Sequence, residues 1–243
     1  RHFGTRRIVI SAQAHLTAFY EKCGFTVCSD VYDEDGIPHC DMFRPPVQLS
    51  AQERQDVMTF ADSDPDENPW VAGKPRTAEI TVSEYDPAWP AVYVQEKQRI
   101  LDVLGDKALH IEHVGSTAVP GLAAKPVVDI DLIVADPADE ATWLPALIAL
   151  GYEHTVREPS WYQHRMLKRD QPQVNLHVFA PRCPEHLRHI LFRDWLITHP
   201  DDLAAYAQSK MTAKNGVSNT MDYNRKKHYT VQQIYARLFA ALP

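Results

Sequence analysis

The amino-acid sequence predicts an α/β (α+β) fold, in which a mixed β-sheet is packed by helices and is preceded by a partial strand–helix–hairpin segment. Two observations support this prediction. From about Glu79 onward, apolar strand-like runs alternate with helical patterns, which is typical of a sheet covered by helices. Ahead of them, extended runs within 25–43 flank Asp33-Glu34-Asp35-Gly36, a strong signal for a hairpin turn.

The first region, residues 1–44, is predicted to contain a strand, a helix and the hairpin, over 4–10, 12–22 and 25–43. A polar stretch rich in Pro, Asp and Glu follows it, and we predict a linker over 45–78. Within this linker, Ser50 followed by Glu53 matches the capping-box pattern that begins helices. A short helix is therefore expected from Ala51 to about Ala61.

The remaining region, 79–243, is predicted to be the main folded domain. Its expected elements are a strand at 79–83, a helix at 90–104, strands at 109–114 and 127–134, a helix at 140–150, strand-like runs at 152–157, 161–168 and 174–179, and helices over most of the remainder. This order predicts a mixed sheet with helices packed on it.

Composition excludes several classes of protein. A chain of 243 residues is long enough for one large domain, or for a small piece followed by a domain of ordinary size. Its formal net charge of −7 provides no general attraction for nucleic acid, so we expect a small-molecule partner and no nucleic acid. No apolar run approaches the roughly 18 to 20 residues that span a bilayer, so no membrane partner is expected.

The four cysteines, Cys23, Cys28, Cys40 and Cys183, show no CxxC pairing. Reduced thiols are therefore expected, and with them a cytoplasmic location. The first residue is Arg1 rather than Met, and no signal-peptide pattern opens the chain. We expect the chain to be a fragment or a processed form of a longer protein.

The most informative motif is a Gly-Ser turn followed by paired acids. Gly115 and Ser116 precede Asp129 and Asp131, which lie in the apolar stretch 127–134. Side chains alternate along a strand, so the two carboxylates share one face. Neighbouring carboxylates need a cation, and Mg²⁺ takes such hard oxygen ligands together with substrate phosphates. The two acids are therefore predicted to be metal ligands and catalytic residues of nucleotidyl transfer.

The turn itself is predicted to bind phosphate. Gly115 has no Cβ, so backbone N–H groups can come close to an anion, and the hydroxyls of Ser116 and Thr117 add further donors. Lys125 supplies a positive charge for the same phosphates. The alternative interpretation is an ordinary turn with two acids at an exposed strand end. The combination of both motifs at this spacing favours the functional interpretation.

Several motifs in the main domain carry a family resemblance. They are HIEHVGSTAVPGLAAKPVVDIDLIV at 110–134, NLHVF at 175–179, FRDWL at 192–196, and Tyr223 with Lys227. The region from 79 to 243 thereby resembles the GrpB family. The resemblance implies a nucleotidyltransferase fold of the polymerase-β type, with the Gly-Ser turn and the DxD strand as its active centre and with Mg²⁺ or Mn²⁺ and a nucleoside triphosphate as cofactor and substrate. Some members are fused to dephospho-CoA kinase, which points to small nucleotide chemistry.

The sequence departs from the nucleotidyltransferase pattern in one respect. Active members of that superfamily usually carry a third carboxylate on a neighbouring strand, where this chain offers Asn175 and His177. Three explanations are open: an altered metal site, His177 acting as a general base, or a pocket that binds nucleotide without turning it over. We include His177 among the predicted catalytic residues.

Basic residues near these motifs are candidates for holding a triphosphate. They are Arg165, Lys168, Arg193, Lys210 and Lys227, and one or two of them are expected to be functional, because most such side chains are solvated or paired. Arg193 and Lys227 are preferred, since they fall in the family-like patterns. On the strand before the turn, His113 is a weaker candidate because of its position beside Gly115.

The first region carries a different resemblance. Residues 6–42, RRIVISAQAHLTAFYEKCGFTVCSDVYDEDGIPHCDM, resemble the C-terminal end of a GNAT acetyltransferase of the ElaA-like group. The resemblance implies that Tyr20 corresponds to the tyrosine that protonates the departing CoA thiolate. The glycine loop that binds the CoA pyrophosphate would lie upstream of Arg1. Acetyl-CoA is therefore expected only for a complete domain, and in this chain Tyr20 is interpreted as an aromatic core residue.

Three hypotheses follow for the function. The first is a metal-dependent nucleotidyltransferase that moves a nucleotidyl group to a small acceptor, with catalysis coming from positioning and charge neutralisation. The second is a non-catalytic nucleotide-binding or regulatory module. The third is an acetyltransferase whose C-terminal domain senses a metabolite.

Overall fold

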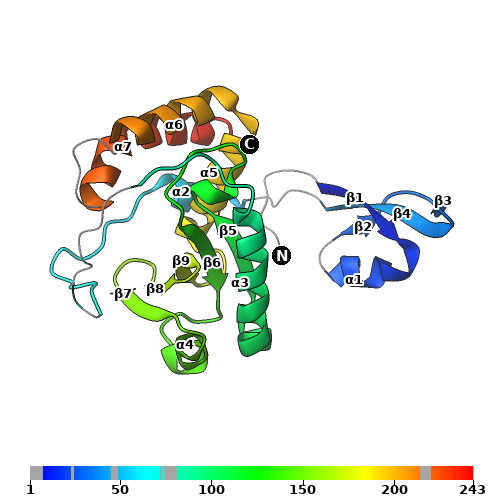
Figure 1. The fold of residues 1–243 in the computed structure, drawn as a ribbon, viewed down its shortest axis with the longest axis horizontal. Coiled ribbons are helices and arrows are strands. Elements are labelled where there is room, and N and C mark those ends of the chain that lie inside the picture. Colours follow the sequence, from blue (N-terminus) through cyan, green and yellow to red (C-terminus); the bar gives the residue numbers. More distant parts are fainter. Residues whose placement is uncertain are drawn as a thin grey trace. The chain divides into compact units, whose positions relative to one another are not determined.

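The computed structural model describes residues 8–22, 25–44, 49–71, 73, 81–213 and 220–242. The chain divides into two compact units, residues 1–50 and 51–243 (Figure 1). The predicted fold class is confirmed, because the chain forms β-sheets packed by helices. Part of the predicted strand at 4–10, and Cys23 near the end of the predicted helix, lie outside the described residues.

The first unit contains a small antiparallel sheet. Its elements are β1 (Ile8–Gln13), the single turn η1 (Ala14–Leu16), α1 (Thr17–Lys22), β2 (Thr26–Val27), β3 (Tyr32–Glu34) and β4 (Ile37–Arg44). The strand β4 pairs with each of the other three strands. The turn between β3 and β4 holds Asp35 and Gly36 at φ angles of 54° and 79°, as a tight Asp-Gly hairpin turn requires.

Strand β1 ends later than the sequence analysis predicts, and α1 begins later. The reason is that Ala12 continues the alternation of the strand and lies opposite Cys40 on β4. Ala12, Cys40 and Met42 form a buried cluster against which Ile10, Tyr20 and Phe25 pack. The ring of Tyr20 meets the ring of Phe25 edge-on at 6.0 Å between centroids. Tyr20 is thus an aromatic packing residue of this unit.

The second unit is built on a five-stranded sheet in the order β5-β6-β9-β8-β7. These strands are β5 (His110–Val114), β6 (Val128–Ile133), β7 (Glu153–Glu158), β8 (His164–Asp170) and β9 (Gln173–Phe179). Only the β6–β9 pair is parallel, and the other three pairs of this sheet are antiparallel. The motif strand β6 therefore has a hydrogen-bonded neighbour on each side.

One face of this sheet is apolar. The helices α3 (Trp89–Leu104) and α4 (Glu140–Ala149) cover it, and η2 (Gly105–Lys107) follows α3 (Figure 1). Val128, Ile130 and Leu132 of β6 point into this core and are almost fully buried. Burial of each such side chain stabilises the fold by roughly 1.5–3 kcal/mol. Because strand side chains alternate, the same burial directs Asp129 and Asp131 to the opposite face.

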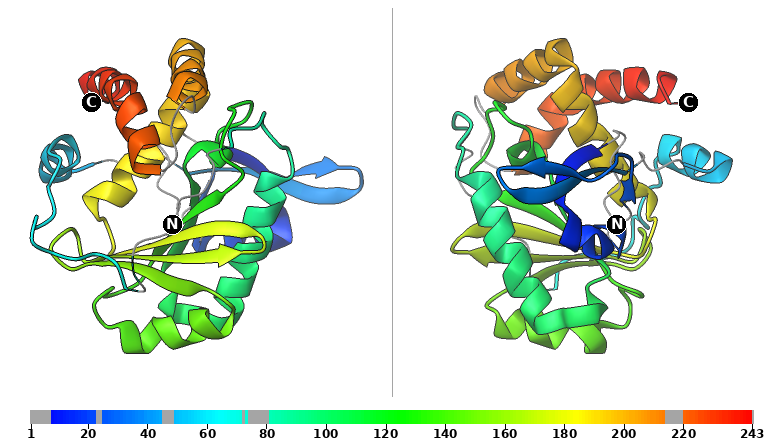
Figure 2. Two further views of the ribbon diagram at one scale, coloured as in Figure 1. Left: turned by 60° about the vertical axis from the view of Figure 1, so that its left-hand side comes forward. Right: turned by 90° about the vertical axis from the view of Figure 1, so that its right-hand side faces the viewer.

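The opposite face is covered by α5 (Pro184–Thr198), which is followed by α6 (Pro200–Ala213) and α7 (Thr220–Ala240) (Figure 2). A second apolar cluster joins these helices to the loop after η3 (Ser116–Ala118). In it, Leu122 and Val119 pack with Tyr206 and Ile234. This cluster holds α6 and α7 close to the Gly-Ser turn.

The predicted linker contains a segment, residues 51–71, that is packed within the second unit; we call it the docked segment. Its helix α2 (Ala51–Met58) packs on α5, ending earlier than predicted, and Trp70 forms a bridge with Val156 of β7. The buried guanidinium of Arg188 on α5 donates to the backbone oxygens of Asp56, Val57 and Thr59. One α5 side chain therefore binds the C-terminal carbonyls of α2, which is where a helix favours positive charge.

Candidate functional site

Gly115 ends β5 in a conformation that only glycine adopts readily. Its φ angle is 69°, and a Cβ placed on it would lie 2.4 Å from Oδ2 of Asp129. The strand register explains this contact, because Val114 lies opposite Asp129. The Gly-Ser turn and the first acid of the DxD motif are therefore in direct contact, as the motif spacing predicts.

Asp129 is held between the turn and the neighbouring strand. Asn175 of β9 lies opposite it and donates from Nδ2 to its Oδ1 at 2.8 Å. Burial raises the pKa of Asp129, although the hydrogen bond from Asn175 and the charge of Lys125 oppose this shift. A carboxylate in this environment gains from a neighbouring cation.

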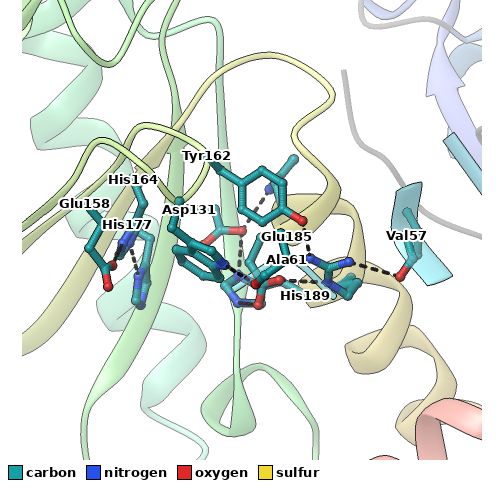
Figure 3. Close-up of polar contacts among 12 residues, drawn as sticks. Val57, Ala61, Asp131, Glu158, Tyr162, His164, His177, Glu185 and His189 are labelled. Atoms are coloured by element: carbon teal, nitrogen blue, oxygen red, sulfur yellow. Dashed lines mark hydrogen bonds and ion pairs between the residues drawn. The ribbon is translucent and has the colours of Figure 1, made fainter. Parts of the chain in front are cut away.

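Asp131 is paired with two histidines of α5 (Figure 3). His186 Nδ1 lies 2.8 Å from its Oδ2, and His189 Nδ1 lies 2.9 Å from the same oxygen and 3.1 Å from Oδ1. Burial would raise the pKa of Asp131, but the charge of His189 and the hydrogen bonds of both imidazoles lower it well below its usual range. Asp131 is thus an ionised carboxylate whose two oxygens both contact imidazole groups.

His189 carries the matching positive charge. Burial opposes its protonation, but Asp131 and Glu185 raise its pKa well above 6.5. Glu185 lies 3.5 Å from Nε2 of His189 and also 2.7 Å from Nε of Arg188. The fully buried Asp131 and the partly buried His189 therefore form an ion pair, which is linked through Glu185 to the residue that holds the docked segment.

His177 belongs to a second chain of hydrogen bonds on the same face (Figure 3). Its Nδ1 lies 3.0 Å from Nε2 of His164, whose Nδ1 lies 2.7 Å from Glu158. Burial and the neighbouring His164 lower the pKa of His177 to about 3. The register places His177 opposite Asp131, so the sequence analysis located it correctly on this face, and it is a neutral imidazole.

Three lysines, Lys125, Lys210 and Lys227, gather behind the Gly-Ser turn; we call them the lysine cluster. Lys210 Nζ is 2.7 Å from Ser116 Oγ. The ammonium groups of Lys125 and Lys227 lie 5.4 and 4.9 Å from the ring centre of Tyr223. Burial and the charge of Lys227 lower the pKa of Lys210 to about 6, and burial lowers that of Lys125. Such crowded cations favour an anion between them.

Arg193 is engaged within the protein. It is buried, and its guanidinium contacts Glu112 Oε2 at 2.7 Å, Asp194 Oδ1 at 2.9 Å and the backbone oxygen of His113 at 2.8 Å. These contacts tie α5 to β5. In this arrangement Arg193 supports the sheet, whereas the sequence analysis assigned it to phosphate.

The remaining residues that the sequence analysis proposed for the site lie on both faces of the five-stranded sheet. The Thr117 hydroxyl lies 2.9 Å from Nε2 of His113, whose ring stacks on Tyr93 in the opposite layer. Arg165 is buried and bound to Glu140. Lys168 on β8 lies opposite Asn175 on β9, and its positive charge helps to lower the pKa of Lys125.

Sequence reasoning missed the residues that bind Asp131. His186 and His189 are three positions apart and therefore share one face of α5, which was a readable signal. Their partner is distant in sequence, so the spacing alone does not reveal that Asp131 lies beneath them. His164 and Glu158 were missed for the same reason.

Asp129 and Asp131 carry carboxylate oxygens on this face of the sheet. Asp129 presents Oδ2 toward the turn, and the same face carries Asp131. Within the described part of the chain, no three His, Cys, Asp or Glu side chains are grouped to hold a metal. Mg²⁺ usually takes one or two carboxylates and completes its shell with substrate phosphate and water, and Asp129 is the carboxylate that faces the Gly-Ser turn.

Comparison with known proteins assigns the two regions of the chain to families. Residues 79–237 match a family described as GrpB protein. The chain belongs to the GrpB family. Residues 1–44 match a second family, described as acetyltransferase (GNAT) domain. Both resemblances seen in the sequence are confirmed.

Individual relatives match part of this chain. The UPF0157 protein BH1888 of Halalkalibacterium halodurans is 46% identical over 165 residues, 68% of this chain and 85% of the relative. A dephospho-CoA kinase of Mycolicibacterium paratuberculosis is 29% identical over 163 residues, 56% of this chain and 40% of that protein. The crystal structure of conserved protein GrpB from Enterococcus faecalis matches with a TM-score of 0.57 and 26% identity, over 66% of this chain and 98% of that one.

The described helices include none that is long and apolar enough to cross a membrane.

The contacts of Arg193 lead to a prediction that separates support of the fold from phosphate binding. Arg193→Lys keeps the charge but loses the planar fork, so it is expected to lower the free energy of unfolding by about 1–2 kcal/mol. Nucleotide affinity should change less than twofold. Urea denaturation and nucleotide titration measure the two effects. A loss of affinity at unchanged stability would contradict the supporting role.

Proposed function

We propose that the second unit binds a nucleoside triphosphate through its phosphates and transfers the nucleotidyl group to a small acceptor, with Mg²⁺ or Mn²⁺ at Asp129. The observation that supports this most directly is the lysine cluster beside the Gly-Ser turn. Ser116, Lys125, Lys210 and Lys227 present hydroxyl and ammonium groups within one partly buried region next to a carboxylate. The phosphates of a bound nucleotide would neutralise the charge of the lysines, and its metal ion would neutralise the charge of the carboxylate.

Each residue would have a distinct part in this reaction. The bound cation would neutralise phosphate charge and align the leaving group. Lys227 and Lys125 would hold the outer phosphates, and the absence of a side chain on Gly115 would allow them close to the backbone. Asn175 would keep the Asp129 carboxylate turned toward the turn. His177 is neutral and would accept a hydrogen bond from the acceptor hydroxyl.

A second candidate function is nucleotide binding without turnover. It is favoured by Asp131, because both its oxygens contact the imidazoles of His186 and His189, and His189 is positively charged. Turnover would then require these contacts to open. A comparison of nucleotidyl transfer by the parent protein and Asp129→Ala, with labelled nucleotide, separates the two functions. Equal turnover would exclude catalysis at this site.

Lys227 is expected to contribute to ATP binding through its charge. Titration of ATP by calorimetry measures this contribution. Lys227→Met is expected to weaken binding by about tenfold.

A matched control is Lys226→Met, which alters the exposed neighbour of Lys227 on α7. It should bind ATP as the parent does. If ATP, with and without Mg²⁺, leaves the melting temperature of the parent protein unchanged, the nucleotide-binding proposal fails.

A further inference from the structure

Ser116 occupies an unusual position for a hydroxyl that only binds phosphate. It follows the glycine turn that ends β5 and begins the short turn η3, so its side chain is presented at the end of a strand, and it is only partly buried. Its Oγ lies 2.7 Å from Nζ of Lys210. Nucleophilic serines of hydrolases sit on comparable sharp turns between a strand and a helix.

Lys210 is built into the protein at this point. Its side chain is 1% exposed, and its amino group also contacts the backbone oxygen of Ala123 at 2.8 Å. The ring centre of Tyr206 lies 4.4 Å from Nζ. These three contacts fix the amino group of Lys210 beside Ser116.

The charges around Lys210 favour its neutral form. Lys227 on α7 disfavours a further positive charge, Asp129 on β6 partly opposes it, and Lys125 in the loop before β6 adds a smaller repulsion. With burial these groups lower the pKa of Lys210 to about 6. At pH 7 most of the amine then carries a lone pair, which can accept the hydroxyl proton of Ser116.

We propose that Ser116 and Lys210 form a nucleophile–base dyad, in which Ser116 attacks an electrophilic phosphorus atom. The Oγ–P bond forms as the bond from phosphorus to its leaving group breaks, the leaving group departs with the bonding electrons, and the Oγ proton passes to Nζ of Lys210. Lys125 and Lys227 stabilise the negative charge on the phosphoryl oxygens. The substrate class is a phosphoric anhydride, and its identification as a nucleotide rests on the proposed function.

The dyad is tested with an uncharged alkyl fluorophosphonate, which needs no nucleotide site. Attack by Ser116 forms the Oγ–P bond, releases fluoride and passes the proton to Lys210, and the adduct is counted by intact-protein mass spectrometry. We expect one adduct, mapped to Ser116 by peptide analysis. The labelling rate should rise with pH through about 6 and then level, and Lys210→Met should reduce it on the order of 100-fold.

Two serine variants test whether the adduct is specific to Ser116. Ser116→Ala should remove the adduct, and Ser209→Ala, which alters the serine next to Lys210, should label as the parent protein does. If Lys210→Met does not fold, Lys210→Arg replaces it, since a guanidinium retains its proton and should slow labelling equally. Labelling at another residue, or an unchanged rate in a folded Lys210 variant, overturns the dyad. If Ser116 is labelled but ATP does not shift the melting temperature, the dyad is supported and the assignment of a nucleotide as its substrate fails.

Discussion

Asp131→Ala is expected to lower the free energy of unfolding by about 1–3 kcal/mol, because it removes the charge partner of the partly buried His189 and the hydrogen bond between Asp131 and the buried His186. Asp131 is fully buried and contacts both His186 and His189. The matched variant is Asp129→Asn on the same strand. The pKa of Asp129 is raised by burial, so loss of its charge should change stability by less than about 1 kcal/mol.

The effect of Asp131→Ala should depend on pH in a defined direction. The pKa of Asp131 is lowered in the folded state, so its contribution is present above about pH 4 and is lost as the pH falls through the folded value. The pKa of His189 is raised, so its contribution is complete below about 6.5 and is lost as the pH rises through the folded value. The parent and the variant should therefore differ most between these limits.

Urea denaturation at several pH values measures this difference. A gap that stays constant from acid to alkaline pH would show that the two groups are not paired as ions. Equal destabilisation by Asp131→Ala and Asp129→Asn would show that the two acids have equivalent surroundings, which the contacts described above do not predict.

Gly115→Ala is expected to destabilise the protein by about 3 kcal/mol and to abolish nucleotide binding. A left-handed φ costs a non-glycine residue roughly 1–2 kcal/mol, and the new Cβ would also lie 2.4 Å from Oδ2 of Asp129. The side chain of Asp129 would have to turn away from the phosphate site. Urea denaturation and ATP titration measure the two losses.

Gly121→Ala separates the two causes of the Gly115 effect. Gly121 has a similar φ of 77°, but nothing lies within 4 Å of its added Cβ, so only the backbone cost of about 1 kcal/mol applies. In the double variant Gly115→Ala with Asp129→Ala, the 2.4 Å contact with Oδ2 is removed although the 3.0 Å contact with the Cβ of residue 129 remains, so part of the lost stability should return. If Gly115→Ala lowers the free energy of unfolding no more than Gly121→Ala does, the contact with Asp129 does not contribute to the destabilisation.

The sequence identifies the part of the site that is local. Gly115, Ser116, Asp129 and Asp131 lie in patterns with a direct physical meaning, namely a tight turn and the alternation of a strand, and the structure brings the turn and the strand together. The apolar neighbours Val128, Ile130 and Leu132 fix which face the acids occupy. These predictions need no knowledge of distant contacts.

The sequence does not reveal contacts between residues that are distant in the chain. Arg193 lies in a family-like motif, but Glu112 lies beneath it and binds its guanidinium. Lys210 was only one of several basic candidates, and its contact with Ser116 depends on how α6 packs on the loop after η3. The strand β1 extends further than predicted because its pairing with β4 outweighs local helix preference.

The docked segment shows that the physical boundary of this unit differs from the boundary of its family resemblance. The GrpB match begins at residue 79, yet the compact unit begins at residue 51. Arg188 on α5 donates hydrogen bonds to backbone oxygens of the docked segment, which lies outside the match. Glu185 contacts both Arg188 and His189. A segment outside the family match is thus connected, through Arg188 and Glu185, to the residue that balances the charge of Asp131.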